Sequence, residues 1–224
     1  MSELVSYLVK TGVLKTPIII DAFEKIKRVD FLPIELKGFS EIDEALPIGF
    51  NQTISQPSVV AFMLELLEPA PGEKVLDIGS GSGWTSALLA YIVSQKNKNG
   101  RVIAIEIIPQ LKEFGKNNVS KYNFIEKGVV KFICADGSKG YAKEAPFDKI
   151  LCSAEIQGGE KIRKKEEMIK IIPEKWKEQL KIGGKIVTPI NNSIFLISKL
   201  DKEKYNIKEF PGFVFVPLVQ KNEK

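Results

Sequence analysis

The sequence of 224 residues is long enough for one full-sized α/β domain with a modest extension. Its hydrophobic content of 44% and charged content of 27% are those of an ordinary globular protein, and no apolar run reaches the length of a membrane span. The chain has no histidine, which excludes a histidine-dependent triad or metal site, and its two cysteines lack metal-ligand spacing, so we expect no metal.

The net charge of +5 comes from lysines interleaved with glutamates, as between Lys161 and Glu167. Mixed signs are typical of solvated helix faces, so we expect no stable nucleic-acid partner. Residues 1–5 lack the basic-then-apolar order of a signal peptide, which predicts a cytoplasmic protein. Cys134 and Cys152 each end a predicted central strand and are expected to be buried free thiols.

Two short N-terminal helices are predicted over residues 2–12 and 16–27, because apolar side chains recur there at helical spacing. Residues 28–50 carry prolines and glycines without a sustained period, which predicts a long ordered loop. We therefore expect an N-terminal helical cap with a covering loop over residues 1–57. Residues 58–224 form the main domain, and the two parts make one compact unit.

Hydroxyl side chains surround Pro57 just before residues 59–67, whose almost wholly apolar sequence predicts a buried helix. On this pattern alone, Ser55 and Ser58 are helix-capping residues, with Pro57 in the first turn of the helix.

The most informative stretch is a buried strand over residues 75–78 that turns through Gly79, Gly81 and Gly83 into a helix over residues 84–95. Such a turn brings backbone N–H groups and a helix N-terminus against a ligand. The spacing is G-x-G-x-G, which differs from the G-x-G-x-x-G of dinucleotide-binding proteins. The alternative is a tight turn that binds nothing.

Two acidic residues at later strand ends favour a nucleotide-like ligand. A strand over residues 101–106 ends in Glu106, where a carboxylate can accept hydrogen bonds from ribose hydroxyls. A strand over residues 129–134 leads to Asp136, which can meet an adenine amino group, and to Gly137.

The remaining elements alternate and then end in strands. A helix is predicted over residues 108–121, and a helical region interrupted at Pro173 is predicted over residues 160–181. Strands are predicted over residues 148–153, 185–190, 193–200 and 213–219, with a hairpin at Asn191-Asn192. This order predicts an α/β fold with a Rossmann-like, doubly wound, mostly parallel seven-stranded sheet and an N-terminal helical cap.

The glycine loop, ribose acid and adenine acid in series resemble the S-adenosylmethionine-dependent methyltransferases with a Rossmann-like fold. Within that class, the chain resembles the protein-L-isoaspartate (D-aspartate) O-methyltransferase family. The most specific matches are two blocks over residues 43–49 and 52–57, DEALPIG and QTISQP. Supporting matches are RVDFLP over 28–33, Asp136-Gly137, Gly140-Tyr141, APFD over 145–148, Gln179 through Gly184, and FVPL over 215–218.

The resemblance implies methyl transfer from S-adenosyl-L-methionine to the free carboxylate of L-isoaspartyl, and further of D-aspartyl, residues in damaged proteins and peptides. It places Ser55 in the active site as the catalytic residue, with Ser58 and Ala154 also at the substrate. It implies that the cofactor is bound by Gln52, Thr53, Ile54, Asp77, Gly79, Ser80, Gly81, Glu106, Asp136 and Gly137. The expected partners are isoaspartyl proteins and peptides, with no membrane, and the protein is expected to act as a monomer.

One departure affects the substrate. The family usually carries an alanine-rich loop after the fourth core strand, whereas this chain has Ala154-Glu155-Ile156-Gln157, and a carboxylate there would repel an anionic substrate unless it points away. Two other classes stay open: a methyltransferase of the same fold that acts on RNA or a small molecule, and a cofactor-binding relative without catalysis.

Overall fold

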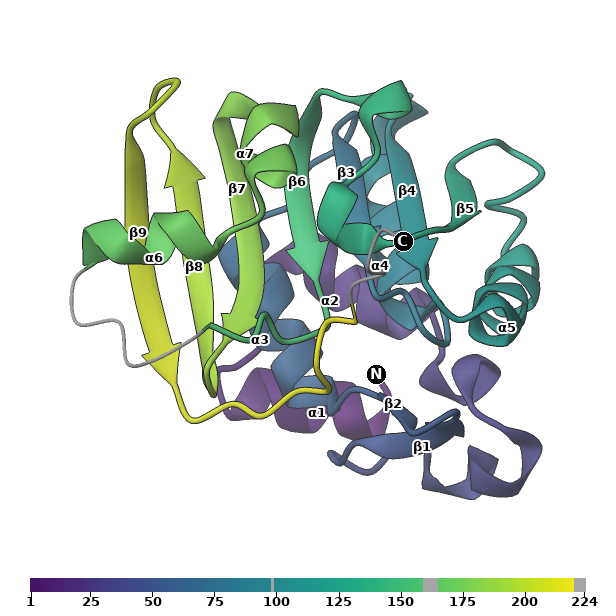
Figure 1. Ribbon diagram of the computed structural model, residues 1–224. Helices are drawn as coiled ribbons and strands as arrows, with labels where there is room; N and C mark the ends of the chain where they lie inside the picture. Colours follow the sequence, from purple (N-terminus) through teal and green to yellow (C-terminus); the bar gives the residue numbers. More distant parts are fainter. Residues whose placement is uncertain (98, 159–164, 220–224) are drawn as a thin grey trace.

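The computed structural model describes residues 1–97, 99–158 and 165–219. A seven-stranded sheet with the order β5-β4-β3-β6-β7-β8-β9 forms the centre of the protein (Figure 1). The strands from β5 to β7 are mutually parallel, and β8 runs antiparallel to both of its neighbours, β7 and β9. The strands are β3 (Lys74–Ile78), β4 (Arg101–Glu106), β5 (Val130–Cys134), β6 (Phe147–Cys152), β7 (Leu180–Ile190), β8 (Ser193–Lys199) and β9 (Tyr205–Pro211). The predicted α/β class and seven-stranded, mostly parallel sheet are confirmed.

Helices cover both faces of this sheet. The α-helices are α1 (Glu3–Lys10), α2 (Pro17–Lys25), α3 (Pro57–Leu67), α4 (Trp84–Val93), α5 (Pro109–Ser120), α6 (Lys165–Ile171) and α7 (Glu174–Gln179). The short 3-10 helices are η1 (Arg28–Phe31), η2 (Ile34–Phe39), η3 (Gln95–Asn97), η4 (Gly137–Lys139) and η5 (Ala142–Glu144). Among the described residues, none of the helices combines the length and the hydrophobicity that crossing a lipid bilayer requires.

The apolar strand sequences are explained by burial on both faces. In β3, Val75 belongs to the apolar cluster under helices α1–α5, whereas Leu76 belongs to the cluster on the opposite face with Trp176. In β4, Val102 and Ile103 divide in the same way. Because successive strand residues point to opposite faces, a strand buried on both sides requires an uninterrupted apolar run.

The predicted loop over residues 28–50 contains more structure than expected. It includes η1, η2 and β1 (Leu46–Gly49), which pairs with β2 (Gln52–Ile54) as a small antiparallel hairpin. The turn uses left-handed backbone at Phe50 and Asn51. This hairpin lacked the long alternating run that marks a half-buried strand in a sequence, because its two strands are only four and three residues long.

The C-terminal strand prediction was wrong. The last strand is β9, and the predicted strand over residues 213–219 is an extended strap, whose Pro217 forms an isolated bridge with Glu155 just beyond the end of β6. We define the strap as residues 212–219. β9 is an edge strand whose mixed sequence follows its partial exposure, so it has no continuous apolar run. The hairpin predicted at Asn191-Asn192 is confirmed between β7 and β8.

Two smaller differences follow from the sheet order. β5 lies at an edge, so Cys134 is exposed and not buried as predicted, whereas Cys152 in the central β6 is buried as expected. β7 begins at Leu180, five residues before the predicted start of this strand. The helical region before it is confirmed from residue 165 with a break at Pro173, and its first predicted residues, 160–164, lie outside the described residues.

Candidate active site

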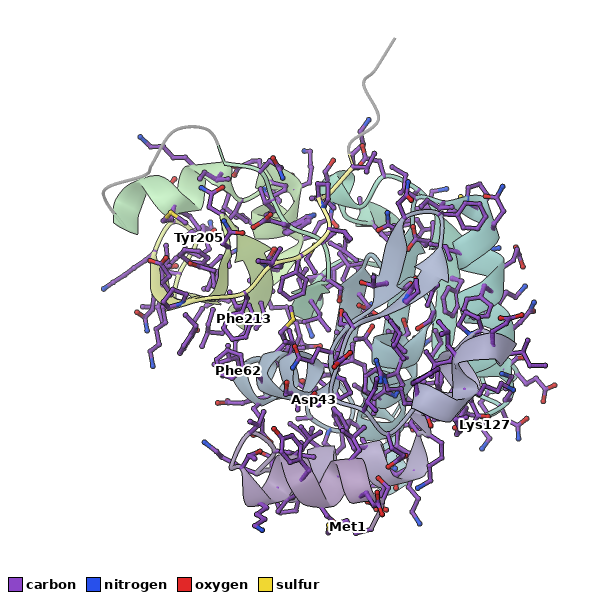
Figure 2. All side chains as sticks on the ribbon, turned by 90° about the horizontal axis from the view of Figure 1, so that it is seen from below. Met1, Asp43, Phe62, Lys127, Tyr205 and Phe213 are labelled. Atoms are coloured by element: carbon purple, nitrogen blue, oxygen red, sulfur yellow. The ribbon has the colours of Figure 1, made fainter. Side chains whose placement is uncertain are left out.

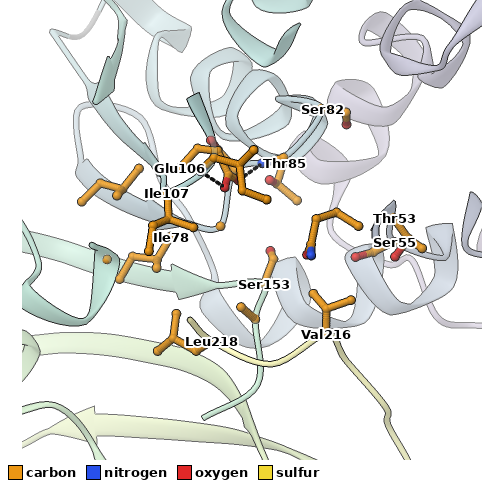
Figure 3. A pocket seen from close by; sticks show the side chains of 18 of the residues that line it. Thr53, Ser55, Ile78, Ser82, Thr85, Glu106, Ile107, Ser153, Val216 and Leu218 are labelled. Carbon is orange, nitrogen blue, oxygen red and sulfur yellow. Dashed lines mark hydrogen bonds between the residues drawn. The ribbon is translucent and has the colours of Figure 1, made fainter. Parts of the chain in front are cut away.

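A pocket opens at the C-terminal ends of β3, β4 and β6, between the sheet, the β1–β2 hairpin and the strap (Figure 3). Counted out to its open mouth, the space between these walls is about 810 Å³. Ten of the predicted site residues line it: Gln52, Thr53, Ile54, Ser55, Gly79, Ser80, Gly81, Glu106, Gly137 and Ala154. Asp77, Asp136 and Ser58 lie outside the lining.

The glycine loop connects β3 to α4 and forms the floor of the pocket. Gly79, Gly81 and Gly83 all have left-handed backbone, with φ of 73°, 50° and 85°, which glycine adopts without steric cost. A Cβ on Gly83 would lie 2.7 Å from the carbonyl oxygen of Gly115. The third glycine of the motif therefore lets α4 pack closely against α5, and the first two shape the pocket wall.

Glu106 ends β4 and is buried at one side of the pocket. Its Oε2 accepts a hydrogen bond of 2.9 Å from Gly81 N, and its Oε1 accepts one of 3.0 Å from Ile108 N (Figure 3). Each carboxylate oxygen can accept a further hydrogen bond. Glu106 thus fixes the glycine loop and keeps acceptor capacity for hydroxyl groups of a bound ligand.

Asp77 lies beneath the loop and is wholly buried. Its Oδ2 accepts hydrogen bonds from Thr85 Oγ1 at 3.0 Å and Ser86 Oγ at 2.5 Å, which fixes the first turn of α4. Oδ1 has no hydrogen-bond partner within the part of the chain that the structure describes. Burial raises the pKa of Asp77 to about 6, the two hydroxyl hydrogen bonds lower it, and Glu106 raises it slightly.

Asp136 also acts from behind the pocket wall. Its carboxylate is buried and accepts hydrogen bonds from the N–H and the hydroxyl of Ser138, at 2.9 and 2.7 Å. Gly137 lines the pocket, and a Cβ there would lie 2.4 Å from Ile78 Cγ2. The carbonyl of Gly137 accepts a 2.8 Å hydrogen bond from Trp176 Nε1, which anchors this wall to α7.

Ser55 reaches the pocket from the end of β2, opposite Glu106 (Figure 3). Its position depends on Arg28, which is buried and donates to the carbonyl oxygens of Ile42 at 3.0 Å, Glu44 at 2.6 Å and Ser55 at 3.4 Å. Burial lowers the pKa of Arg28 to about 10, while nearby acidic residues raise it, so the guanidinium stays charged at neutral pH. Sequence reasoning found Arg28 only as part of a matching block and missed this role.

The interpretation of Ser55 and Ser58 as capping residues is wrong. α3 begins after Gln56 without a side-chain cap from its own N-cap residue. Instead, Asp43 Oδ1 accepts a 2.8 Å hydrogen bond from Ser58 N in the first turn of α3. A carboxylate suits this position because a helix N-terminus carries unpaired N–H groups and a partial positive charge. The Ser55 hydroxyl is therefore available to the pocket.

Glu155 does not point into the pocket. Ala154 lines it, but the next side chain is buried and accepts a 2.6 Å hydrogen bond from Asn192 N in the β7–β8 turn. The repulsion that Glu155 would cause toward an anionic substrate is avoided by this orientation.

The strap forms a wall of the pocket that sequence reasoning did not assign to the site. Val216, Pro217 and Leu218 line the pocket. Glu155 N donates to Val216 O, and Leu218 N donates to Glu155 O, each at 2.7 Å. Farther along, Phe213 stacks on Phe62 of α3 with ring centroids 5.2 Å apart (Figure 2). The apolar run FVFVPL was the available signal.

The sheet order, the glycine loop and the acid at the end of β4 define a protein of the Rossmann-like methyltransferase class. A profile of the family described as protein-L-isoaspartate(D-aspartate) O-methyltransferase matches residues 1–223. The chain belongs to this family.

Individual relatives agree over nearly the whole length. The protein-L-isoaspartate O-methyltransferase of Methanopyrus kandleri is 38% identical over 221 residues, which cover 97% of this chain and 90% of the relative. That of Staphylothermus marinus is 35% identical over 223 residues, which cover 97% and 92%. A crystal structure of the Plasmodium falciparum protein of this description, in complex with S-adenosyl-L-homocysteine, has a TM-score of 0.80 at 22% identity and 97% coverage of both chains.

Proposed function

We propose that this protein transfers the methyl group of S-adenosylmethionine to the free carboxylate of L-isoaspartyl residues in damaged proteins and peptides, with D-aspartyl residues as a further substrate. The observation that carries the proposal is that Ser55, the glycine loop and Glu106 line one pocket. The family membership supports the reaction, and the relative with bound S-adenosylhomocysteine supports the cofactor.

The residues of the pocket fit this cofactor. The left-handed glycines leave the floor free of side chains, and Glu106 offers acceptor positions for ribose hydroxyls beside the two N–H groups it already binds. Ile78, Ile107 and Leu218 supply apolar surface for a base. We assign Gln52, Thr53, Ile54, Gly79, Ser80, Gly81 and Gly137 to direct cofactor contacts, with Asp77 and Asp136 supporting them from behind.

When bound, the cofactor supplies a methyl group on a positively charged sulfur, which is a good leaving group. The substrate carboxylate has an unperturbed pKa of about 4 and is already ionised at neutral pH, so no general base is required. A chain without histidine can therefore perform this reaction.

The protein's task is alignment. Ser55 can donate a hydrogen bond that orients the substrate carboxylate, and correct orientation contributes up to roughly 7–11 kcal/mol in well-aligned reactions. Ala154 keeps the opposite wall small, and Glu155 is held away from it by Asn192. In this proposal Ser58 lies at the outer side of the substrate, on α3 next to the pocket.

The test is methyl transfer from radiolabelled S-adenosylmethionine to two peptides that differ only in L-isoaspartate or L-aspartate at one position. Base-labile label on the isoaspartyl peptide alone is expected, because a carboxyl methyl ester hydrolyses in mild base. Equal label on both peptides, or no label while S-adenosylhomocysteine binding is demonstrated, would contradict the proposal. The second outcome would make RNA and small acids the next substrates to assay.

The proposal extends to a protein that acts as a monomer in the cytoplasm and has no nucleic-acid partner. Light scattering of the purified protein, with and without RNA, tests the first and last of these points.

A further inference from the structure

Ser153 is a pocket residue that sequence reasoning did not assign to the site. It directly follows β6, lines the pocket next to Ala154 and is half-buried. Figure 3 shows its hydroxyl directed into the pocket. Among the described residues, this hydroxyl has no hydrogen-bond partner. One polar side chain at the pocket surface is therefore free to bind a ligand.

The backbone around Ser153 is held on both sides. Its N–H donates to Ile78 O at 2.9 Å, at the end of β3. The Cys152 thiol donates to Ala154 O at 3.1 Å, and Glu155 pairs with the strap through both of its backbone groups. A hydroxyl on a backbone fixed in this way has few alternative positions, as a pre-organised hydrogen-bond donor requires.

Ser153 is also the polar side chain that this segment presents to the pocket. Cys152 is wholly buried, Ala154 is small and apolar, and Glu155 is turned away to Asn192. A carboxylate ligand accepts hydrogen bonds and is repelled by like charge, and a serine hydroxyl can donate without adding a negative charge. The segment thus directs its carboxylate away from the pocket and a neutral donor into it.

The position of Ser153 favours the substrate side of the pocket over the ribose side. Glu106, which we assign to ribose hydroxyls, ends β4, and β4 lies on the other side of β3 from β6. Ser153 instead borders the first glycine of the loop, because a Cβ on Gly79 would lie 3.8 Å from the carbonyl carbon of Ser153. Ser55 reaches the pocket from β2, so the two hydroxyls belong to different walls.

We infer that Ser153 is a second catalytic residue, whose hydroxyl donates a hydrogen bond to the substrate carboxylate. The inference rests on the proposed function and deepens it. Ser55 alone would leave the carboxylate free to pivot about one hydrogen bond, whereas two donors from different walls fix its plane.

The hydrogen bond from Ser153 goes to the carboxylate oxygen that does not attack. The other oxygen then keeps its electron pairs for the reaction. It forms a bond to the methyl carbon as the carbon–sulfur bond breaks, and the electron pair of that bond stays on sulfur. No proton is transferred, so the hydroxyl acts by orientation and needs no base beside it.

The experiment compares the wild type with Ser153→Ala and Ser153→Cys, since a thiol keeps most of the volume but is a weak donor. Calorimetry gives the Kd of S-adenosylhomocysteine and then the Kd of an isoaspartyl peptide for that complex, which has no methyl group to transfer. In both variants we expect a higher peptide Kd and a kcat/KM lower by roughly ten- to hundredfold, as for the loss of a hydrogen bond to a charged group. The Kd of S-adenosylhomocysteine should stay unchanged, which also shows that the variants fold.

Ser120→Ala is the control, because it removes an exposed hydroxyl at the end of α5 that bonds only to Asn117 O. It should match the wild type. The double variant Ser55→Ala/Ser153→Ala tests whether both hydroxyls hold one carboxylate. Its loss in kcat/KM should be smaller than the product of the two single losses, because a carboxylate that already pivots gains less from the remaining donor.

The outcomes separate this inference from the proposed function. If the wild type does not methylate the isoaspartyl peptide, the proposed function fails and the inference fails with it. If the wild type does, wild-type kinetics in Ser153→Ala or Ser153→Cys would overturn the inference alone. Weaker binding of S-adenosylhomocysteine with an unchanged peptide Kd would also overturn it, by assigning the hydroxyl to the cofactor. Single losses that simply multiply in the double variant would show that the two hydroxyls act on different groups, and would overturn it as well.

Discussion

At the scale of single residues, Ser55 and Glu106 lie on opposite sides of one pocket and should control different steps (Figure 3). We expect Ser55→Ala to lower kcat roughly ten- to hundredfold, since a hydrogen bond to a charged group contributes about 1.5–3 kcal/mol. Its affinity for S-adenosylhomocysteine should be nearly unchanged. Glu106→Ala should instead weaken that affinity by a comparable factor, because two backbone N–H groups and the ribose lose their acceptor.

Calorimetric titration with S-adenosylhomocysteine and steady-state kinetics on an isoaspartyl peptide separate the two effects. Ser55→Thr is the matched control, because it retains a hydroxyl. A Ser55→Ala protein that loses cofactor affinity without a separate loss in kcat would assign Ser55 to the cofactor.

Asp77 should make the stability of the protein depend on pH. Burial raises its folded-state pKa to about 6 from an ordinary value of 3.8, so the folded protein holds this proton where the unfolded chain has released it. Stability from this group is therefore fully present below about pH 4 and falls as the pH rises to about 6. The total loss is roughly 3 kcal/mol.

The Asp77→Asn variant provides the test, because its amide cannot ionise and keeps one oxygen for Thr85 and Ser86. The free energy of unfolding of both proteins is measured with urea across this pH range. Between pH 4 and 6, the wild type should lose stability relative to the variant. Above pH 6, the difference between the two proteins should stay constant. A difference between the two that does not vary with pH would show that Asp77 titrates normally.

At the scale of elements, Glu155 connects the strap to the β7–β8 turn. Its carboxylate accepts from Asn192 N, its backbone pairs with Val216 and Leu218, and Asn192 O accepts from the N–H groups of Gly212 and Phe213. One residue thus fixes both ends of the pocket wall. The departure from the family's alanine-rich loop has a structural reason, although sequence alone made it look like a change of substrate.

We expect Glu155→Ala to loosen the strap, since a buried N–H left without an acceptor costs about 1–3 kcal/mol. The KM for peptide and the Kd for S-adenosylhomocysteine should both rise severalfold, and protease cleavage within residues 212–219 should become faster. Glu155→Gln, which keeps an acceptor, should restore most of the loss.

Glu209→Ala is the matched control in the same region. Glu209 accepts a hydrogen bond from Ser193 Oγ on the same hairpin, but its pairing does not reach the strap. If Glu155→Ala and Glu209→Ala gave equal effects, the strap would not depend on Glu155.

At the scale of the whole molecule, we propose that the N-terminal cap and the main domain unfold together. The apolar cluster runs without a break from Leu8 in α1 to Leu88 in α4, and Phe23 meets Trp84 edge-on at 5.5 Å. Tyr122, just after α5, accepts a hydrogen bond from Lys27 N at 2.9 Å.

The two tryptophans report on opposite faces of the sheet, because Trp84 contacts the cap, whereas Trp176 lies in α7 and packs in the apolar cluster on the other face. The Trp176→Phe variant leaves Trp84 as the fluorescent reporter, and Trp84→Phe leaves Trp176. Within each variant, we expect the denaturation midpoint measured by tryptophan fluorescence to equal the midpoint measured by circular dichroism. A fluorescence midpoint for Trp84 clearly below that of circular dichroism would mean that the cap melts first.

The sequence allowed the central fold to be predicted because its signals are local. β3 and β4 are buried on both faces, so their continuous apolar runs predicted the first and last residues of each strand closely. The glycine loop directly follows β3, and Glu106 is the last residue of β4. The exposed Cys134 and the missed β9 have another cause. Whether a strand lies at an edge depends on the order of the sheet, which no short pattern contains.

The site was predicted incompletely for the same reason. The strap belongs to the pocket through backbone pairing with Glu155, about 60 residues earlier, and Arg28 positions Ser55 through carbonyl groups of the intervening loop. Backbone hydrogen bonds leave almost no trace in residue identity. The resemblance to a family recovered these segments as matching blocks without giving their physical role.

The strap has a consequence for how the protein is made. It follows every other wall of the pocket in the chain, so a ribosome that adds about 5–20 residues per second produces the sheet and the glycine loop first and the last wall of the binding site at the end. Cellular S-adenosylmethionine therefore cannot assist the nascent chain through a complete site. It can stabilise only the completed, folded protein, so the ligand protects this enzyme after its synthesis and not during it.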